Sequence, residues 1–168
     1  MKVDVTGFEA LQRQFQDMEK DLNGAVKAAL FNGAKIAADE VKAGLQSLPT
    51  AGTDQLDSDG NARYQRAGHM LSGPTPKQKE DLIESMGVAS FREQNGKMTT
   101  SIGFNGYGRS TWKGGQKLPN QVLMREVESG TSWMRKHPVI RPAVTRTREK
   151  IKAEMSKTFK EKENLSNG

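Results

Sequence analysis

Apolar and small side chains recur three and four positions apart near the start of the chain, and this spacing constrains the fold more than any other feature. One stretch contains Phe8, Leu11, Phe15, Met18 and Leu22, and a second contains Val26, Ala29, Leu30, Gly33, Ile36, Ala37, Val41 and Leu45. This spacing places the side chains of each stretch on one face of an α-helix. Asn23-Gly24 separates the stretches, so the sequence predicts two helices, at about 8–21 and 23–46. The preceding KVDV predicts a short extended lead-in.

Small residues are frequent in the second of these helices, and aromatic residues are scarce in the whole chain. The small residues are Ala28, Ala29, Gly33, Ala34, Ala37 and Ala38, which would let another helix or a sheet approach closely. With 34% hydrophobic residues, 6% aromatic residues and 17 glycines, the chain is not expected to build a thick interior. Part of its apolar surface is therefore expected to be covered by further copies or by partners.

Residues 48–80 differ in character from the helices before them. The stretch is rich in Gly, Pro, Asp, Ser and Thr, and its apolar residues keep no period. It predicts a long mobile loop. A loop of this length is uncommon in a domain unless it is functional, so two alternatives stay open: a segment that orders on assembly, or simple disorder.

The next part of the chain predicts a hairpin, a second loop and a short helix. Asn95-Gly96 is a strong signal for a two-residue hairpin turn, and the imperfect alternation beside it suggests one bulge. Residues 105–120 are glycine-rich and predict a loop. VLMREVESG then predicts a short helix that ends at Gly130.

The last helix is expected to begin between Pro138 and Pro142 and to run to about Lys160. Prolines are tolerated in the first turn because the amides that they lack have no helical partner there. The expected buried stripe is Ile140, Val144, Thr147, Ile151 and Met155. The sequence thus predicts an α+β fold with two N-terminal helices, a small antiparallel hairpin-based sheet and a long C-terminal helix. Residues 1–160 form the expected single domain, and 161–168 a frayed tail.

Charge and composition limit the function without choosing it. The chain has 26 Lys+Arg against 20 Asp+Glu, a net charge of +6, a pI near 9.6 and no cysteine. These values suit a polyanion or an acidic protein surface, and they exclude disulfides and thiolate chemistry. No signal peptide or long apolar run is present, so we expect a protein made in the cytoplasm that contacts no membrane.

Candidate catalytic and ligand-binding motifs do not assemble into a site. His69 and His137 lack neighbouring ligands or an oriented nucleophile in the sequence. The acidic stretch 57–68 has Ala62 where a calcium loop requires glycine, and GFNGYG does not match a dinucleotide fingerprint. The sequence therefore predicts no enzyme, with no catalytic residues, no metal and no cofactor.

Basic and aromatic residues in the 105–120 loop raise a second possibility. Arg109, Trp112, Lys113 and Lys117 combine positive charge with a stacking group, and the last helix carries several basic residues. They are candidate contacts with a partner or, non-specifically, with DNA. The alternative function is accordingly a basic nucleic-acid-binding protein that is not part of a virion.

Short motifs in a fixed order resemble a known family. VESGT at 127–131, then HPVIRPA at 137–143 leading into a charged helix, resembles the C-terminal signature of the long-tailed-phage putative tail-component family. VDVTGFEALQRQF resembles the opening of that family, and DLIESMGV resembles its entry into the sheet. The resemblance covers most of the chain apart from 48–80 and the tail.

The resemblance implies a non-enzymatic virion protein at or near the head–tail junction. Relatives are described as tail-completion, neck or minor tail components, some of which form rings around the DNA passage. It implies a homo-oligomer, hexameric in a ring, with head–tail junction or tail-tube proteins as partners and the virion as its location. Partner contacts are expected in the 48–80 and 105–120 loops. The matched residues would form a structural corner, with Glu128 and Arg141 as a pair: Glu128, Gly130, Thr131, Pro138, Arg141 and Pro142.

Overall fold

Four α-helices and three small antiparallel strand pairs make up the part of the chain that the structure describes. The structure is a computed structural model that describes residues 6–63, 70–111 and 115–166. The helices are α1 (Thr6–Gln46), a 3-10 turn at Thr53–Gln55, α2 (Pro76–Ser85), α3 (Asn120–Ser129) and α4 (Ile140–Ser166). The strands are β1 (Met86–Val88), β2 (Arg92–Gln94), β3 (Lys97–Thr99), β4 (Ile102–Phe104), β5 (Tyr107–Thr111) and β6 (Lys117–Pro119). The mixed helix-and-strand class is as predicted. The predicted lead-in at 2–5 lies outside the described residues.

The prediction of two N-terminal helices is wrong, because α1 is a single helix of 41 residues. Gly24 lies inside it, and a Cβ at this position would meet nothing within 4 Å. A glycine in a helix interior costs about 1 kcal/mol relative to alanine. That cost is small beside the packing of the segment that follows, from Ala25 to Leu45, so the helix does not break.

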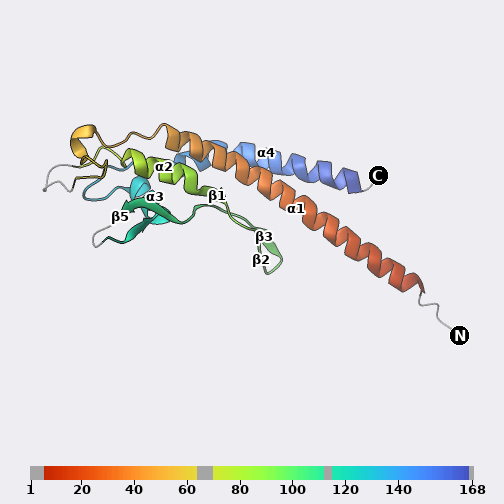
Figure 1. Cartoon of the computed structure of the whole chain (residues 1–168). Helices are drawn as coiled ribbons and strands as arrows, with labels where there is room; N and C mark the ends of the chain where they lie inside the picture. Colours follow the sequence, from red (N-terminus) through yellow and green to blue (C-terminus); the bar gives the residue numbers. More distant parts are fainter. Residues whose placement is uncertain (1–5, 64–69, 112–114, 167–168) are drawn as a thin grey trace.

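Helix α1 packs against α4 in the antiparallel direction (Figure 1). Gly44, near the end of α1, lies against Val139 just before the start of α4. Gly33, farther back along α1, lies against Met155 in the second half of α4. A Cβ on Gly33 would sit 2.8 Å from Met155 Cγ, so the small residues permit the close approach that their spacing predicted. The expected stripe of α4 needs one correction: Val144 is 45% exposed, and Ala143 is buried in its place. The helix also continues through Ser166, beyond the expected end near Lys160.

The predicted hairpin is present and is longer than its turn alone suggests. Asn95 and Gly96 both have positive φ, 53° and 70°, and join β2 to β3. Beyond them β1 pairs with β4, and Val88 lies opposite Ile102. Between the two pairs, residues 89–91 face only residues 100 and 101, so the register changes by one residue as the imperfect alternation predicted.

A second hairpin replaces most of the predicted 105–120 loop. Strands β5 and β6 pair from Tyr107↔Pro119 to Thr111↔Lys117, with an irregularity between these positions. The sequence hid this pair because its strands are short and the segment around them is glycine-rich, and because β5 is held by contacts with the distant helix α2.

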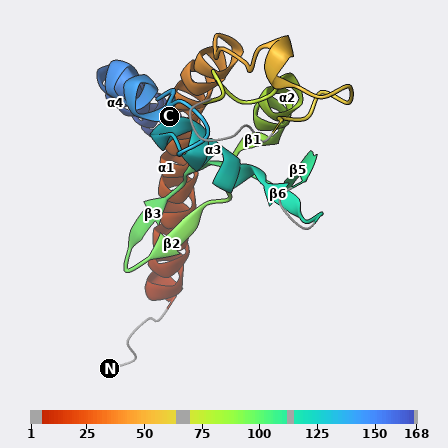
Figure 2. The same cartoon turned by 90° about the vertical axis from the view of Figure 1, so that its left-hand side faces the viewer.

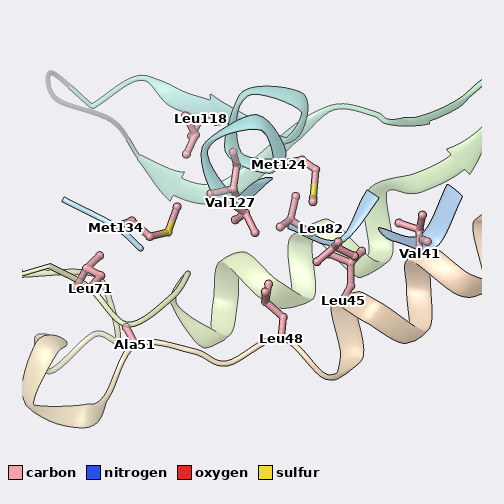
Figure 3. Close-up of a cluster of buried hydrophobic side chains, with 13 residues drawn as sticks. Val41, Leu45, Leu48, Ala51, Leu71, Leu82, Leu118, Met124, Val127 and Met134 are labelled. Atoms are coloured by element: carbon pink, nitrogen blue, oxygen red, sulfur yellow. The ribbon is translucent and has the colours of Figure 1, made fainter. Parts of the chain in front are cut away.

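The segment predicted as a long loop contributes to the core. Leu48, Ala51 and Leu71 are buried within it, and α2 begins at Pro76, inside the predicted loop. Thr75 accepts from the Gln78 N–H and starts that helix through a capping box. Thirteen buried side chains form one cluster, and they come from the helices, the 48–80 segment, β6 and the α3–α4 connection. Figure 3 labels ten of them: Val41, Leu45, Leu48, Ala51, Leu71, Leu82, Leu118, Met124, Val127 and Met134; the others are Leu123, Val139 and Ala143.

Lys79 of α2 ties the C-terminal end of α1 to this core. Its ammonium group donates to the carbonyls of Gln46 and Leu48, at 2.7 and 2.8 Å. A cation at a helix C-terminus satisfies carbonyls that have no helical partner and opposes the helix dipole. This contact fixes α2 against the end of α1.

Candidate functional site at the corner between α3 and α4

The carboxylate of Glu128, near the end of α3, caps the start of α4. Its Oε2 accepts the backbone N–H groups of Val139 and Ile140, at 2.7 and 2.9 Å. Its Oε1 accepts the backbone N–H of Arg141 at 3.1 Å. The first N–H groups of a helix have no helical acceptor, so one side chain from the preceding helix supplies what α4 lacks.

The first turn of α4 has no N–H left without an acceptor. Pro142 follows the three groups that bind Glu128, and proline has no N–H. The next residue, Ala143, already donates to the Val139 carbonyl at 3.2 Å. Glu128 and Pro142 together therefore satisfy the start of the helix.

Electrostatics keep the Glu128 carboxylate charged at neutral pH. Burial alone would raise its pKa, but the N–H groups of Val139, Arg141 and Ile140, with the Arg141 charge, hold the pKa below its ordinary value near 4.5. A negative charge at a helix N-terminus is also favoured by the helix dipole. The expected pairing of Glu128 with Arg141 is thus made through the Arg141 backbone, and the guanidinium contributes a longer-range attraction.

Gly130 turns the chain sharply after α3, as its predicted role as a cap requires. Its φ of 76° and ψ of 167° suit glycine, and its N–H donates to the Glu126 carbonyl at 2.7 Å. A Cβ there would lie 2.9 Å from Lys136 Cβ and 3.0 Å from the Lys136 backbone nitrogen. No other residue fits without movement of the backbone.

Thr131 shapes the turn that follows. Its hydroxyl oxygen accepts the N–H groups of Met134 and Trp133, at 3.0 and 3.3 Å, and its own N–H donates to the Met134 carbonyl. The turn places Met134, which is fully buried, in the core. Thr131 therefore holds the corner to the hydrophobic cluster.

A short bridge joins the corner to the segment before α2. The Leu71 N–H donates to the Trp133 carbonyl at 2.8 Å, and the Arg135 N–H donates to the Leu71 carbonyl at 3.1 Å. His137 Nε2 lies 2.5 Å from the Ser72 carbonyl, which can only accept, so the proton is on Nε2. His137 therefore has a structural partner, whereas His69 lies outside the described residues.

The two prolines of the corner lie on either side of the capped amides. Pro138 is exposed and immediately precedes Val139, and Pro142 is half-buried in the first turn of α4. Each proline fixes φ near −65°, which reduces the freedom of the chain where it enters the helix. All six residues of the predicted corner thus lie at the end of α3, in the connection that follows it, or in the first turn of α4.

Arg109 is not near this corner but holds β5 to α2. Its backbone N–H and its Nε donate to the two oxygens of Asp81, at 2.8 and 2.7 Å, and its Nη2 donates to Glu80 at 2.9 Å. The Asp81 side chain is only 6% exposed. A Cβ on Gly108 would lie 2.8 Å from Asp81 Oδ2, so glycine is needed beside the clamp. The charge of Arg109 is thus already balanced within the chain.

Of the other three predicted contact residues of the 105–120 segment, only Lys117 lies within the described residues. Lys117 is exposed on β6, opposite Thr111. Trp112 and Lys113 lie outside the described residues. Of the four residues, the structure describes Arg109 and Lys117, which lie on the paired strands β5 and β6, and the Arg109 guanidinium is bound by Asp81 and Glu80.

In the stretch that loosely resembles a calcium loop, the Asp57 carboxylate accepts hydrogen bonds from N–H groups of the same turn. Asp57 Oδ1 accepts the N–H groups of Asp59 and Asn61, at 2.9 and 2.8 Å. Within 6–63, 70–111 and 115–166, no cluster of three or more His, Cys, Asp or Glu side chains could hold a metal ion. The turn therefore needs only its own hydrogen bonds to hold its shape.

An apolar groove far from the corner was missed at the sequence level. It has a volume of about 500 Å³ and lies where α1, α4 and the β2–β3 hairpin meet. No local signal could reveal it, because its walls come from three segments distant in sequence. The residues that line this α1–α4 groove are Leu22, Asn23, Val26, Ala29, Leu30, Glu93, Gly96, Met98, Met155, Ser156 and Phe159.

Comparisons with protein families, curated proteins and solved structures found no match to this chain. In the part of the chain that the structure describes, no helix is both long and apolar enough to span a membrane.

Proposed function

We propose that this chain is a structural protein of a phage virion, a tail-completion or head–tail joining component that works by assembly and not by catalysis. The observation that carries the proposal is the capped corner. Its contacts are made by the residues of VESGT and HPVIRPA, on which the resemblance to the tail-component family rests. The shared residues thus have a mechanical role in this chain.

The corner supports an assembly role because it fixes the connection between two helices. Glu128 binds α4 directly, Gly130 adopts the positive φ that the sharp turn requires, and the bridge to Leu71 ties the turn to the core. A protein whose copies must meet at repeatable angles needs such fixed joints. We propose that the copies form a ring, hexameric as in the family that the chain resembles, around the passage for DNA.

A non-enzymatic role is supported by what the candidate catalytic groups already do. Glu128 accepts three backbone N–H groups, and His137 donates to a backbone carbonyl. A general base or nucleophile needs free access to substrate, which these contacts oppose. We therefore propose no cofactor and no catalytic step.

The partners in this proposal are further copies of the chain and neighbouring proteins of the neck, the head–tail junction or the tail tube. Lys117 and the basic residues of α4 would make non-specific contact with DNA in the passage. The site of action is the virion, with assembly in the host cytoplasm and no membrane contact.

A nucleic-acid-binding protein outside the virion is the second candidate, favoured by one observation. Residues 150–162 in the second half of α4 contain five lysines and two glutamates. Free protein that binds duplex DNA with a steep salt dependence, in the absence of any particle, would favour this candidate. Arg109 contributes little to it, because its charge is balanced by Asp81 and Glu80.

Deletion of the gene from the phage or prophage that carries it tests the main proposal. Heads and tails should then accumulate separately in electron micrographs, and the wild-type gene supplied from a plasmid should restore joined particles. Purified wild-type particles should contain the chain in several copies. Normal infectious particles without the chain would refute the proposal.

A further inference from the structure

Helix α1 extends well beyond the end of its partner α4. Asn32 of α1 donates to Thr158 of α4 at 3.0 Å, and α4 ends at Ser166. Since the helices are antiparallel, α4 ends near residue 24 of α1. The first part of α1, from Thr6 to about residue 22, then runs on for roughly 24 Å at 1.5 Å per residue. Figures 1 and 2 both show this projecting start of α1.

The α1–α4 groove lies where this projection begins. Its walls include Leu22 and Val26 of α1, Met98 of β3, and Met155 and Phe159 of α4. Leu22 is 53% exposed even though it continues the buried stripe of α1. Apolar surface of this kind favours contact with an apolar partner.

The sequence of the projecting segment fits such a groove. Residues 6–21 carry apolar residues at positions 8, 11, 15 and 18. This is the three- and four-residue spacing by which an amphipathic helix binds in a groove. A groove on one copy and a projecting helix on another are therefore matched in chemistry.

Charge decides which surface of the second copy fits best. Residues 6–21 contain four acidic and two basic residues, whereas residues 150–162, beside the groove, contain five lysines and two glutamates. Two of these lysines, Lys152 and Lys157, have exposed glutamate partners, which contribute little and can exchange. The projecting segment therefore suits the basic end of a neighbouring α4 better than another acidic segment.

We propose that the α1–α4 groove of each copy binds the start of α1 from a second copy of this chain. The contact joins two different surfaces, so it can repeat head-to-tail from copy to copy, and it does not place two acidic α1 starts against each other. Head-to-tail contacts generate closed rings when the rotation closes. This inference rests on the proposed ring assembly and names the surfaces that form it.

Cross-linking between single-cysteine variants tests the contact directly, because the chain has no cysteine of its own. Phe15→Cys and Met98→Cys should form a disulfide-linked dimer when mixed and mildly oxidised, well above the level that either variant forms alone. Replacing Met98→Cys by Phe31→Cys is the control, since Phe31 is 49% exposed on α1 and lies outside the groove. Equal cross-linking of both pairs would overturn the proposal.

A matched pair of charge substitutions tests the energetics. Leu22→Glu should weaken self-association at least tenfold, measured by sedimentation or native mass spectrometry, because it places a charge in the groove. Phe31→Glu should leave the association unchanged, and both variants should keep the wild-type helix content, because both positions are exposed.

The outcomes separate this inference from the proposed function. An oligomer that neither cross-links at these positions nor responds to Leu22→Glu overturns the groove contact and leaves the virion role standing. A strict monomer at every concentration also overturns it and assigns the groove to a different partner. Cross-linking as expected, together with normal particles made without the chain, supports the contact and removes the virion role.

Discussion

Replacing Glu128 by alanine should destabilise the protein far more than an ordinary half-exposed substitution. The change removes the acceptor of three N–H groups at the start of α4, at 2.7, 2.9 and 3.1 Å. A net hydrogen bond to a charged group contributes about 1.5–3 kcal/mol, and loss of a helix cap costs about 0.5–2 kcal/mol. The three bonds share one carboxylate, and water can reach part of the site, so they do not add in full.

We therefore expect Glu128→Ala to lower the free energy of unfolding by about 2–3 kcal/mol. In a chain of this size the melting temperature should fall by roughly 4–12 °C. Glu128→Gln keeps one acceptor and loses the charge, so its cost should be about 1–2 kcal/mol. Urea unfolding followed by circular dichroism at 222 nm measures both values.

Glu126→Gln is the matched control, two residues earlier on α3. Glu126 Oε2 is buried with no hydrogen-bond partner among the described residues, and burial raises the pKa of this carboxyl. Removing its charge should leave stability unchanged or raise it slightly. The reasoning fails if Glu128→Ala costs less than about 0.5 kcal/mol, the range of ordinary surface substitutions, or if both positions respond alike.

The two carboxyls should also differ in the sign of their pH dependence. The pKa of Glu128 is lowered in the folded state, so its contribution is present above about 4.5 and is lost as the pH falls through the folded pKa. The difference between wild type and Glu128→Ala should therefore shrink in acid. The folded pKa of Glu126 is raised, so its charge costs stability at neutral pH and that cost disappears as the pH falls through the raised pKa. A constant Glu128→Ala difference down to pH 3 would contradict the cap.

Three further substitutions, two of them with a matched control, test other contacts by chemical unfolding. Gly130→Ala should cost about 2 kcal/mol, because it forces a side chain into positive φ and against the following turn; a cost near zero would mean that the corner can relax. Asp81→Ala should cost about 2–3 kcal/mol, because the backbone N–H and the Nε of Arg109 lose a charged and buried acceptor, whereas Glu80→Ala, at the exposed end of the same clamp, should change little. Gly44→Ala should destabilise, since its methyl would sit 2.6 Å from a valine side chain, while Gly24→Ala, with open space around it, should stabilise by up to about 1 kcal/mol. Equal effects of the two glycine substitutions would contradict the packing of α1 on α4.

Local chemistry explains the parts of the fold that the sequence predicted. Asn95-Gly96 adopts the positive φ values that its turn requires, and Gly130 ends α3 as a helix-ending glycine should. Ala29, Gly33 and Ala37 are buried at the four-residue spacing of one helix face, and Gly33 lies against Met155 of α4. Each of these features is decided by a few neighbouring residues, which is why sequence reasoning could reach them.

Contacts between residues distant in sequence explain the parts of the fold that could not be predicted from the sequence. Asn23-Gly24 predicts a break, but a local cost of about 1 kcal/mol does not interrupt a helix that is packed from Ala25 onward. The apolar residues of the 48–80 stretch keep no period because single residues, such as Ala51 and Leu71, are buried in the core while their neighbours along the chain are not part of the cluster. Strand β5 depends on Asp81, 28 positions before Arg109. None of these partners is near in the chain.

The role of Glu128 lies between these cases, and one signal in the sequence does point to it. Helix α4 starts after Val139, which cannot cap a helix with its side chain, and no Ser, Thr, Asp or Asn stands nearby. A helix without a local cap must take an acceptor from elsewhere. Glu128 could be predicted as a partner of Arg141, but the three backbone N–H groups could be identified only once the corner was folded.

The corner and the α1–α4 groove lie at opposite ends of α4, and this separation makes their roles separable. Contacts with α1 hold α4 along its length, so the corner mainly fixes α3 and the β5–β6 hairpin relative to the helix pair. Substitution of Glu128 should therefore lower stability without changing the groove near Phe159. Substitution of Leu22 should weaken self-association without changing stability. If the Glu128 variants, at temperatures where they remain folded, lost self-association as strongly as Leu22→Glu, the two ends would be coupled and the independent roles proposed for them would be wrong.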